Sequence, residues 1–92
     1  MSHRYWQQGD VLLKQGATIP AGSLPRPDGV LAHGEATGHT HHLTETSDAV
    51  LYEHAGILYL RVGPGAATIR HEEHAPVTVP EGAYTIGIIR EY

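Results

Sequence analysis

Residues 49–62 read AVLYEHAGILYLRV, and this stretch identifies the chain as a β-protein. Two runs rich in aliphatic, β-branched and aromatic residues, 49–53 and 57–62, flank the short segment His54-Ala55-Gly56. A three-residue connection that ends in glycine suits a turn closed by a left-handed residue, so we expect a β-hairpin here. Every second residue from Leu58 to Val62 is aliphatic, which predicts one face of this strand in the core.

Further strands are expected on both sides of this hairpin. They are predicted at residues 9–15, from residue 30 through the histidines near residue 40, and at residues 67–71, 76–80 and 83–92. Gly34 and Gly38 fall inside the second of these strands, where glycine indicates a bulge or a close backbone approach.

No segment has a helical period, and the rest of the chain is expected to be loop. Residues 16–29 carry three prolines and three glycines and are predicted to be a loop. About seven short strands, with turns at intervals of roughly 8–12 residues, indicate an all-β protein with a single domain over residues 1–92. The architecture expected is a small β-sandwich or barrel.

The composition predicts a thin core. The chain has 92 residues, no phenylalanine and a single tryptophan, Trp6. A domain of this size buries a modest apolar area, so a bound metal or a second subunit is expected to support it. We therefore predict a homodimer.

Charge and hydropathy disfavour two classes of partner. The formal net charge is −4, and the six basic residues are scattered along the sequence, which argues against nucleic-acid binding. No apolar run approaches the roughly 18 residues that span a membrane, and the N-terminus does not resemble a signal peptide. The expectation is a cytoplasmic protein of bacterial type with no membrane partner.

Histidine is the most informative residue type for function. The chain has eight histidines, five of which lie in two clusters, at residues 39–42 and 71–74, and it has no cysteine. Neutral imidazole is the commonest protein ligand for first-row transition metals. Because side chains alternate on a strand, His39 and His41 are expected to share a face and to bind one ion. The alternative is that both clusters are solvated loop histidines.

The second cluster, His71-Glu72-Glu73-His74, is one residue too short for the helical H-E-x-x-H motif, and it is predicted to be a turn between two strands. His71 would then share a face with Ile69 and point towards a pocket, so it is favoured over His74 as a further ligand. Glu72 or Glu73 is a candidate general base, although an adjacent pair of glutamates is commonly a solvated acidic pair.

One segment carries a resemblance to a known family. Residues 34–45 read GEATGHTHHLTE, which resembles the first cupin motif: a glycine, then H-x-H, three residues and a glutamate. Pro80-Glu81-Gly82 resembles the P-x-G turn of the second cupin motif. This resemblance implies a cupin-like jelly roll, with His39, His41 and Glu45 as metal ligands.

The chain also departs from the cupin pattern. The glycine lies one residue too close to the first histidine, no glycine follows Glu45 at the family's distance, and Thr85 stands where a fourth ligand is expected. The chain is similar as well to a set of small bacterial proteins of unassigned activity, which share G-E-x-T-G-H-x-H, H-E-E-H and a final R-E-Y.

Three functions remain open at this point. The first is a metal-dependent enzyme, of the hydrolase, isomerase or oxygenase type that the cupin resemblance implies, acting on a small-molecule substrate. Its divalent ion could be Zn, Fe, Ni, Mn, Cu or Co, and Tyr84, after the P-x-G turn, could donate a hydrogen bond to a bound oxyanion. The second is a non-catalytic metal- or ligand-binding module. The third is an interaction protein whose histidines respond to pH.

Overall fold

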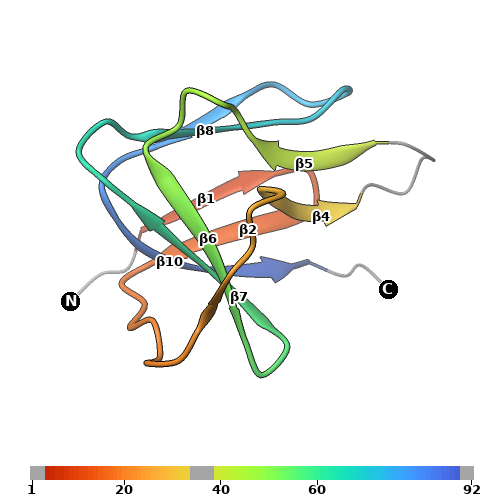
Figure 1. Ribbon diagram of the computed structural model, residues 1–92. Helices are drawn as coiled ribbons and strands as arrows, with labels where there is room; N and C mark the ends of the chain where they lie inside the picture. The colour runs from red at the N-terminus through yellow and green to blue at the C-terminus, as the bar shows by residue number, and fades with distance from the viewer. Residues whose placement is uncertain (1–3, 34–38, 90–92) are drawn as a thin grey trace.

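A computed structural model describes residues 4–33 and 39–89 and shows two antiparallel β-sheets that face one another as a sandwich (Figure 1). The all-β fold expected from the alternating patterns is confirmed, and the described residues contain no helix that could cross a membrane. Whether the sandwich is the cupin-like jelly roll stays a prediction. The strands are β1 (Tyr5–Gln8), β2 (Val11–Gln15), β3 (Leu24–Pro25), β4 (Val30–His33), β5 (Thr40–Leu43), β6 (Ala49–His54), β7 (Ile57–Val62), β8 (Ala67–Arg70), β9 (Val77–Val79) and β10 (Gly82–Ile88).

The larger sheet has six strands in the order β1-β2-β10-β7-β6-β3, and the smaller sheet has four in the order β4-β5-β8-β9. The strand β10 pairs with both β2 and β7, so the C-terminal part of the chain joins the two hairpins of the larger sheet. The Pro/Gly-rich segment at residues 16–29 is loop except for β3, whose two residues add an edge strand to β6. Proline is tolerated there because an edge strand leaves one side of its backbone unpaired.

The core lies between the sheets and is built from aliphatic residues and one tyrosine. Leu60 is fully buried and pairs across the sheet with Leu51 on one side and Tyr84 on the other. The predicted alternation in β7 is confirmed, because Leu58, Leu60 and Val62 all belong to the core cluster or pack against it. The buried apolar residues are Val11, Leu13, Leu31, Leu51, Leu60, Val62, Ala67, Ile69, Val79 and Tyr84.

The hairpin at residues 49–62 is confirmed, but its loop is shorter than expected. His54 pairs with Ile57, so only Ala55 and Gly56 form the turn. Both have positive φ, 51° and 79°, the combination of a type I′ turn, whose twist matches that of the two strands. The prediction of a three-residue loop was wrong because the strand pairing extends to His54, one residue beyond the hydrophobic run.

Ala55 in this turn is strained, since an L-residue in the left-handed region costs roughly 1–2 kcal/mol. We expect Ala55→Asn to stabilise the protein by about 1 kcal/mol, which raises the melting temperature by roughly 4–8 °C for a domain of this size. Gly56→Ala is the matched control and should lower it, although nothing lies within 4 Å of the added Cβ, because its φ is positive as well. A thermal melt in which Ala55→Asn leaves the transition unchanged contradicts this account.

The strand predicted to run from residue 30 through the first histidine cluster is instead two strands. β4 and β5 pair antiparallel, with Ala32 opposite His41, so the chain reverses direction between them. The bulge predicted at Gly34 and Gly38 falls outside the described residues. Glycines between two apolar runs fit a chain reversal as readily as a bulge, and the sequence pattern alone did not separate the two.

Two edge strands, β1 of the larger sheet and β9 of the smaller, contact one another along one side of the sandwich. The turn between β1 and β2, at residues 9–10, therefore lies near the β8–β9 connection at residues 71–76. The start of β5 lies beside the same connection, because β5 pairs with β8. Both histidine clusters are thus brought to this side of the sandwich.

Candidate metal centre

Four histidine rings from the two clusters form one contact group. β5 pairs with β8 through His42 and Arg70, and continuing this antiparallel register by one residue places His41 opposite His71. Their ring centroids are 4.3 Å apart. The ring of His71 also lies 5.6 Å from that of His39 and 4.6 Å from that of His74. The two clusters that the sequence separates by some thirty residues therefore share one site.

Two of these histidines, His39 and His71, and the neighbouring Glu72 each offer one ligand atom. These three atoms lie within 4.8 Å of one another. His39 directly precedes β5, and His71 and Glu72 directly follow β8, so the pairing of these strands brings the three side chains together. Two imidazoles and a carboxylate form a donor set that suits divalent transition metals.

Each glutamate of the second cluster has a partner. The backbone N–H of Thr40 donates to Glu72 Oε2 at 3.2 Å. A hydrogen bond from its own backbone amide, together with this second one, holds the pKa of the Glu72 carboxyl below its ordinary value. Glu73 Oε1 lies 3.2 Å from Nδ1 of His39. A hydrogen on Nδ1 leaves the lone pair of His39 on Nε2, the arrangement that metal-binding histidines adopt beside a carboxylate.

His71 also accepts a hydrogen bond, since the backbone N–H of Glu73 donates to its Nδ1 at 3.0 Å. In the neutral ring the hydrogen is then on Nε2. Binding of an ion through either nitrogen therefore replaces this bond, at a cost of about 1 kcal/mol.

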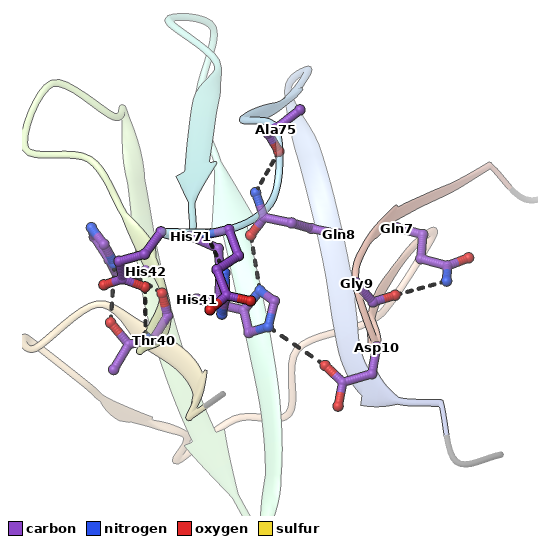
Figure 2. A network of polar contacts seen from close by, with 11 residues as sticks. Gln7, Gln8, Gly9, Asp10, Thr40, His41, His42, His71 and Ala75 are labelled. Atoms are coloured by element: carbon purple, nitrogen blue, oxygen red, sulfur yellow. Dashed lines mark hydrogen bonds and ion pairs between the residues drawn. The ribbon is translucent and has the colours of Figure 1, made fainter. Parts of the chain in front are cut away.

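His41 differs from the other three histidines because it is only 1% exposed. Its Nδ1 is 2.9 Å from Oε1 of Gln8, and its Nε2 is 3.5 Å from Oδ1 of Asp10 (Figure 2). Burial is the main cause that lowers the pKa of His41 below its ordinary value, and it favours the neutral ring.

Gln8 holds the second cluster in place from the opposite sheet. Its side-chain amide donates to the backbone carbonyls of Ile69 and Ala75, both at 2.9 Å, on either side of the loop that carries His71 and Glu72. Figure 2 shows the bond to Ala75. Neither Gln8 nor Asp10 was predicted as a site residue. The only sequence signal is a polar Gln-Gly-Asp segment at a strand end, which is also ordinary turn composition.

The remaining predicted site residues lie apart from the three-atom group or at its border. Glu45 is exposed in a depression that it shares with Arg26 and Val50, and none of the described residues that line this depression is a histidine. Tyr84 is fully buried, and its hydroxyl donates to the carbonyl oxygen of Pro80 at 2.5 Å.

His74 is exposed, and its ring lies against Gly9, where an added Cβ would approach Nε2 of His74 to 2.6 Å. Its ring is stacked with that of His41 at a centroid distance of 5.9 Å.

The full set of candidate residues lies within the span of one known family model. That model is described as a domain of unknown function, DUF8820, and it matches residues 7–89. The chain belongs to the DUF8820 family. The match includes Gln8, Asp10 and both histidine clusters, so the whole site is part of the DUF8820 domain. No curated protein and no solved structure matches the chain.

Proposed function

We propose that this DUF8820 protein binds a divalent transition-metal ion through His39, His71 and Glu72 and uses it on an oxygen-bearing small molecule. The observation that carries this proposal is the convergence of the three ligand atoms within 4.8 Å at the paired ends of β5 and β8. Bound there, an ion supplies Lewis acidity towards a substrate oxygen or towards water.

The number and exposure of the ligands support a site that is open to solvent. Structural zinc sites are closed by four protein ligands, whereas catalytic sites have three and leave one position for water or substrate. This group has three ligands, and Glu72 is exposed. The lowered pKa of Glu72 supports the proposal as well, because the carboxylate is available to a cation over a wider pH range.

Glu73 takes the role of a positioning residue in this proposal. Its carboxylate oxygen lies 3.2 Å from Nδ1 of His39, and a hydrogen on that nitrogen leaves Nε2 to face the ion. Outer partners of this kind typically contribute 10- to 100-fold in metal affinity. Of the two glutamates considered as general bases, Glu72 is thereby assigned to the ion and Glu73 to the orientation of His39.

The proposal is tested by elemental analysis of the full chain, purified without a metal-affinity tag, together with thermal melting in the presence and absence of a chelator. We expect bound transition metal and a higher melting temperature in the metal-loaded protein, because an ion that binds the folded state alone stabilises it. In amide spectra, titration with Zn²⁺ should shift the Glu73 resonance, since its N–H loses the acceptor on His71. A metal-free protein whose melting and spectra ignore Zn²⁺, Co²⁺ and Ni²⁺ contradicts the proposal.

A further inference from the structure

The side-chain amide of Gln8 has only one orientation that satisfies its surroundings. Gln8 is 2% exposed, and one end of its amide meets two backbone carbonyl oxygens, those of Ile69 and Ala75. Only the NH₂ group can donate to two acceptors, so Nε2 lies at that end and Oε1 faces His41. The amide oxygen is therefore the partner of Nδ1 of His41, at 2.9 Å.

This orientation determines where the hydrogen of His41 lies. Because Oε1 of Gln8 can only accept, Nδ1 of His41 must donate and carries the hydrogen. In the neutral ring the lone pair is then on Nε2. A buried imidazole with its tautomer fixed in this way presents a ready ligand atom on its other side, as metal-binding histidines do.

The atom that faces this lone pair is another acceptor. Oδ1 of Asp10 lies 3.5 Å from Nε2 of His41 (Figure 2). The distance exceeds the usual 2.7–3.2 Å of a hydrogen bond to oxygen. It matches the edge of a tetrahedral coordination sphere, about 3.4 Å for ligand bonds near 2.1 Å.

A third ligand is available beside this pair. The ring of His74 is stacked with that of His41, and its Nε2 lies over Gly9, the neighbour of Asp10 in the turn. The space is open to His74 because Gly9 has no side chain. His74 is exposed, so its imidazole can rotate towards Asp10 without disturbing the core.

We infer that Asp10, His41 and His74 form a second site for a divalent transition-metal ion, next to the site of His39, His71 and Glu72. In the described residues, the ligand atoms of His39, His71 and Glu72 lie within 4.8 Å of one another. Asp10 and His41 are not part of such a three-ligand group. The two sites share no ligand, so either can exist without the other. Zn²⁺ and Co²⁺ are the ions best matched to two imidazoles and one carboxylate.

The test is a titration of the metal-free full chain with Co²⁺, followed by calorimetry and by visible absorption, which distinguishes tetrahedral from octahedral cobalt. We expect the unmodified protein to bind two ions, Asp10→Asn to lose one of them, and His39→Ala to lose the other. Glu81→Gln removes an exposed carboxylate that lies beside Gln15, at the other end of β2 from Asp10, and this variant should still bind two ions. Because His74 is exposed, His74→Ala serves as a second variant that leaves the fold intact, and it should weaken the ion that Asp10→Asn loses.

The outcomes separate this inference from the proposed function. A single ion that is lost in His39→Ala and retained in Asp10→Asn and His74→Ala overturns the second site and leaves the proposed function standing. A single ion that is lost in Asp10→Asn and weakened in His74→Ala, but retained in His39→Ala, supports the second site and contradicts the proposed function. In the metal-loaded protein, nitrogen-15 spectra should show His41 with its hydrogen on Nδ1, beside Oε1 of Gln8. Hydrogen on Nε2 in the loaded protein would overturn the inference, because that nitrogen is the proposed ligand atom.

Discussion

Gln8→Leu is expected to lower the free energy of unfolding by about 3–6 kcal/mol, a large part of the 5–15 kcal/mol that a small domain has. The substitution removes the partner of three polar groups at once: the carbonyls of Ile69 and Ala75 and the Nδ1–H of His41. The carbonyl of Ile69 and the Nδ1–H of His41 are buried and cost roughly 1–3 kcal/mol each without a partner, whereas the carbonyl of Ala75 is only part-buried and costs less. Leucine is similar in volume, so the loss reflects hydrogen bonding and not a cavity.

Gln7→Leu is the matched control, because Gln7 is exposed and its side chain donates only to the carbonyl of Gly9. Its effect should stay within about 0.5 kcal/mol, as for most surface substitutions. Gln8→Glu keeps an acceptor for His41 but sets a buried carboxylate oxygen against the two carbonyl oxygens, so it should destabilise the protein at least as much as Gln8→Leu. Urea unfolding at unchanged m-value measures all three. Equal midpoints for Gln7→Leu and Gln8→Leu would show that the contacts of Gln8 do not hold the loop.

Most of the strands could be predicted because their signal is local, although β1 and β3 were not among the strands expected. The alternation in β7 follows from a period of two residues, and the turns on either side of β8 and β9 follow from glycine and proline. The residue at which two strands stop pairing is determined by contacts across the sheet and not by the sequence of either strand alone. For this reason the hairpin loop at Ala55 was predicted one residue too long, and β4 and β5 were predicted as one strand.

The metal-ligand candidates could be predicted in part, because histidines cluster along the chain. The spacing of His39 and His41 predicted a common face and a common ion. Each ring lies near that of His71, but the three-ligand group found in the described residues contains His39 and not His41. That spacing could not show that His41 is buried against Gln8, since Gln8 lies 33 residues away along the chain and in the opposite sheet. Asp10 was missed for the same reason.

Glu45 was predicted as a ligand from the cupin resemblance. The structure places it in a depression, and none of the described residues that line this depression is a histidine. Its role as a metal ligand stays a prediction that rests on the resemblance alone, since a motif specifies a ligand set only where the strands that follow it take the family's path.

His39→Ala is expected to remove the ion of the three-ligand site and the stability that the ion confers. At a free metal concentration 100-fold above the dissociation constant, a bound ion stabilises the fold by about 2.7 kcal/mol, equivalent to roughly 10–20 °C in melting temperature for a domain of this size. In an Asp10→Asn background, which isolates this site, the variant should melt at the same temperature with and without metal. His33→Ala removes an exposed histidine of β4 and should keep the full metal-dependent shift.

The same variants decide between an enzyme and a binding module. If the ion is catalytic, His39→Ala loses metal and turnover together on a panel of esters, phosphoesters, lactones and small oxo acids. Glu73→Ala, which removes the acceptor of His39 Nδ1 without removing a ligand, should bind metal 10- to 100-fold more weakly and recover turnover when metal is raised. If the ion only braces β5 against the β8–β9 connection, no substrate on the panel is turned over, and the melting temperature alone follows metal occupancy. An ion that binds at full stoichiometry and stabilises the fold, without turnover of any substrate, would contradict an enzymatic function and support a metal-binding module. The three ligands would then stabilise the fold and take no part in a reaction.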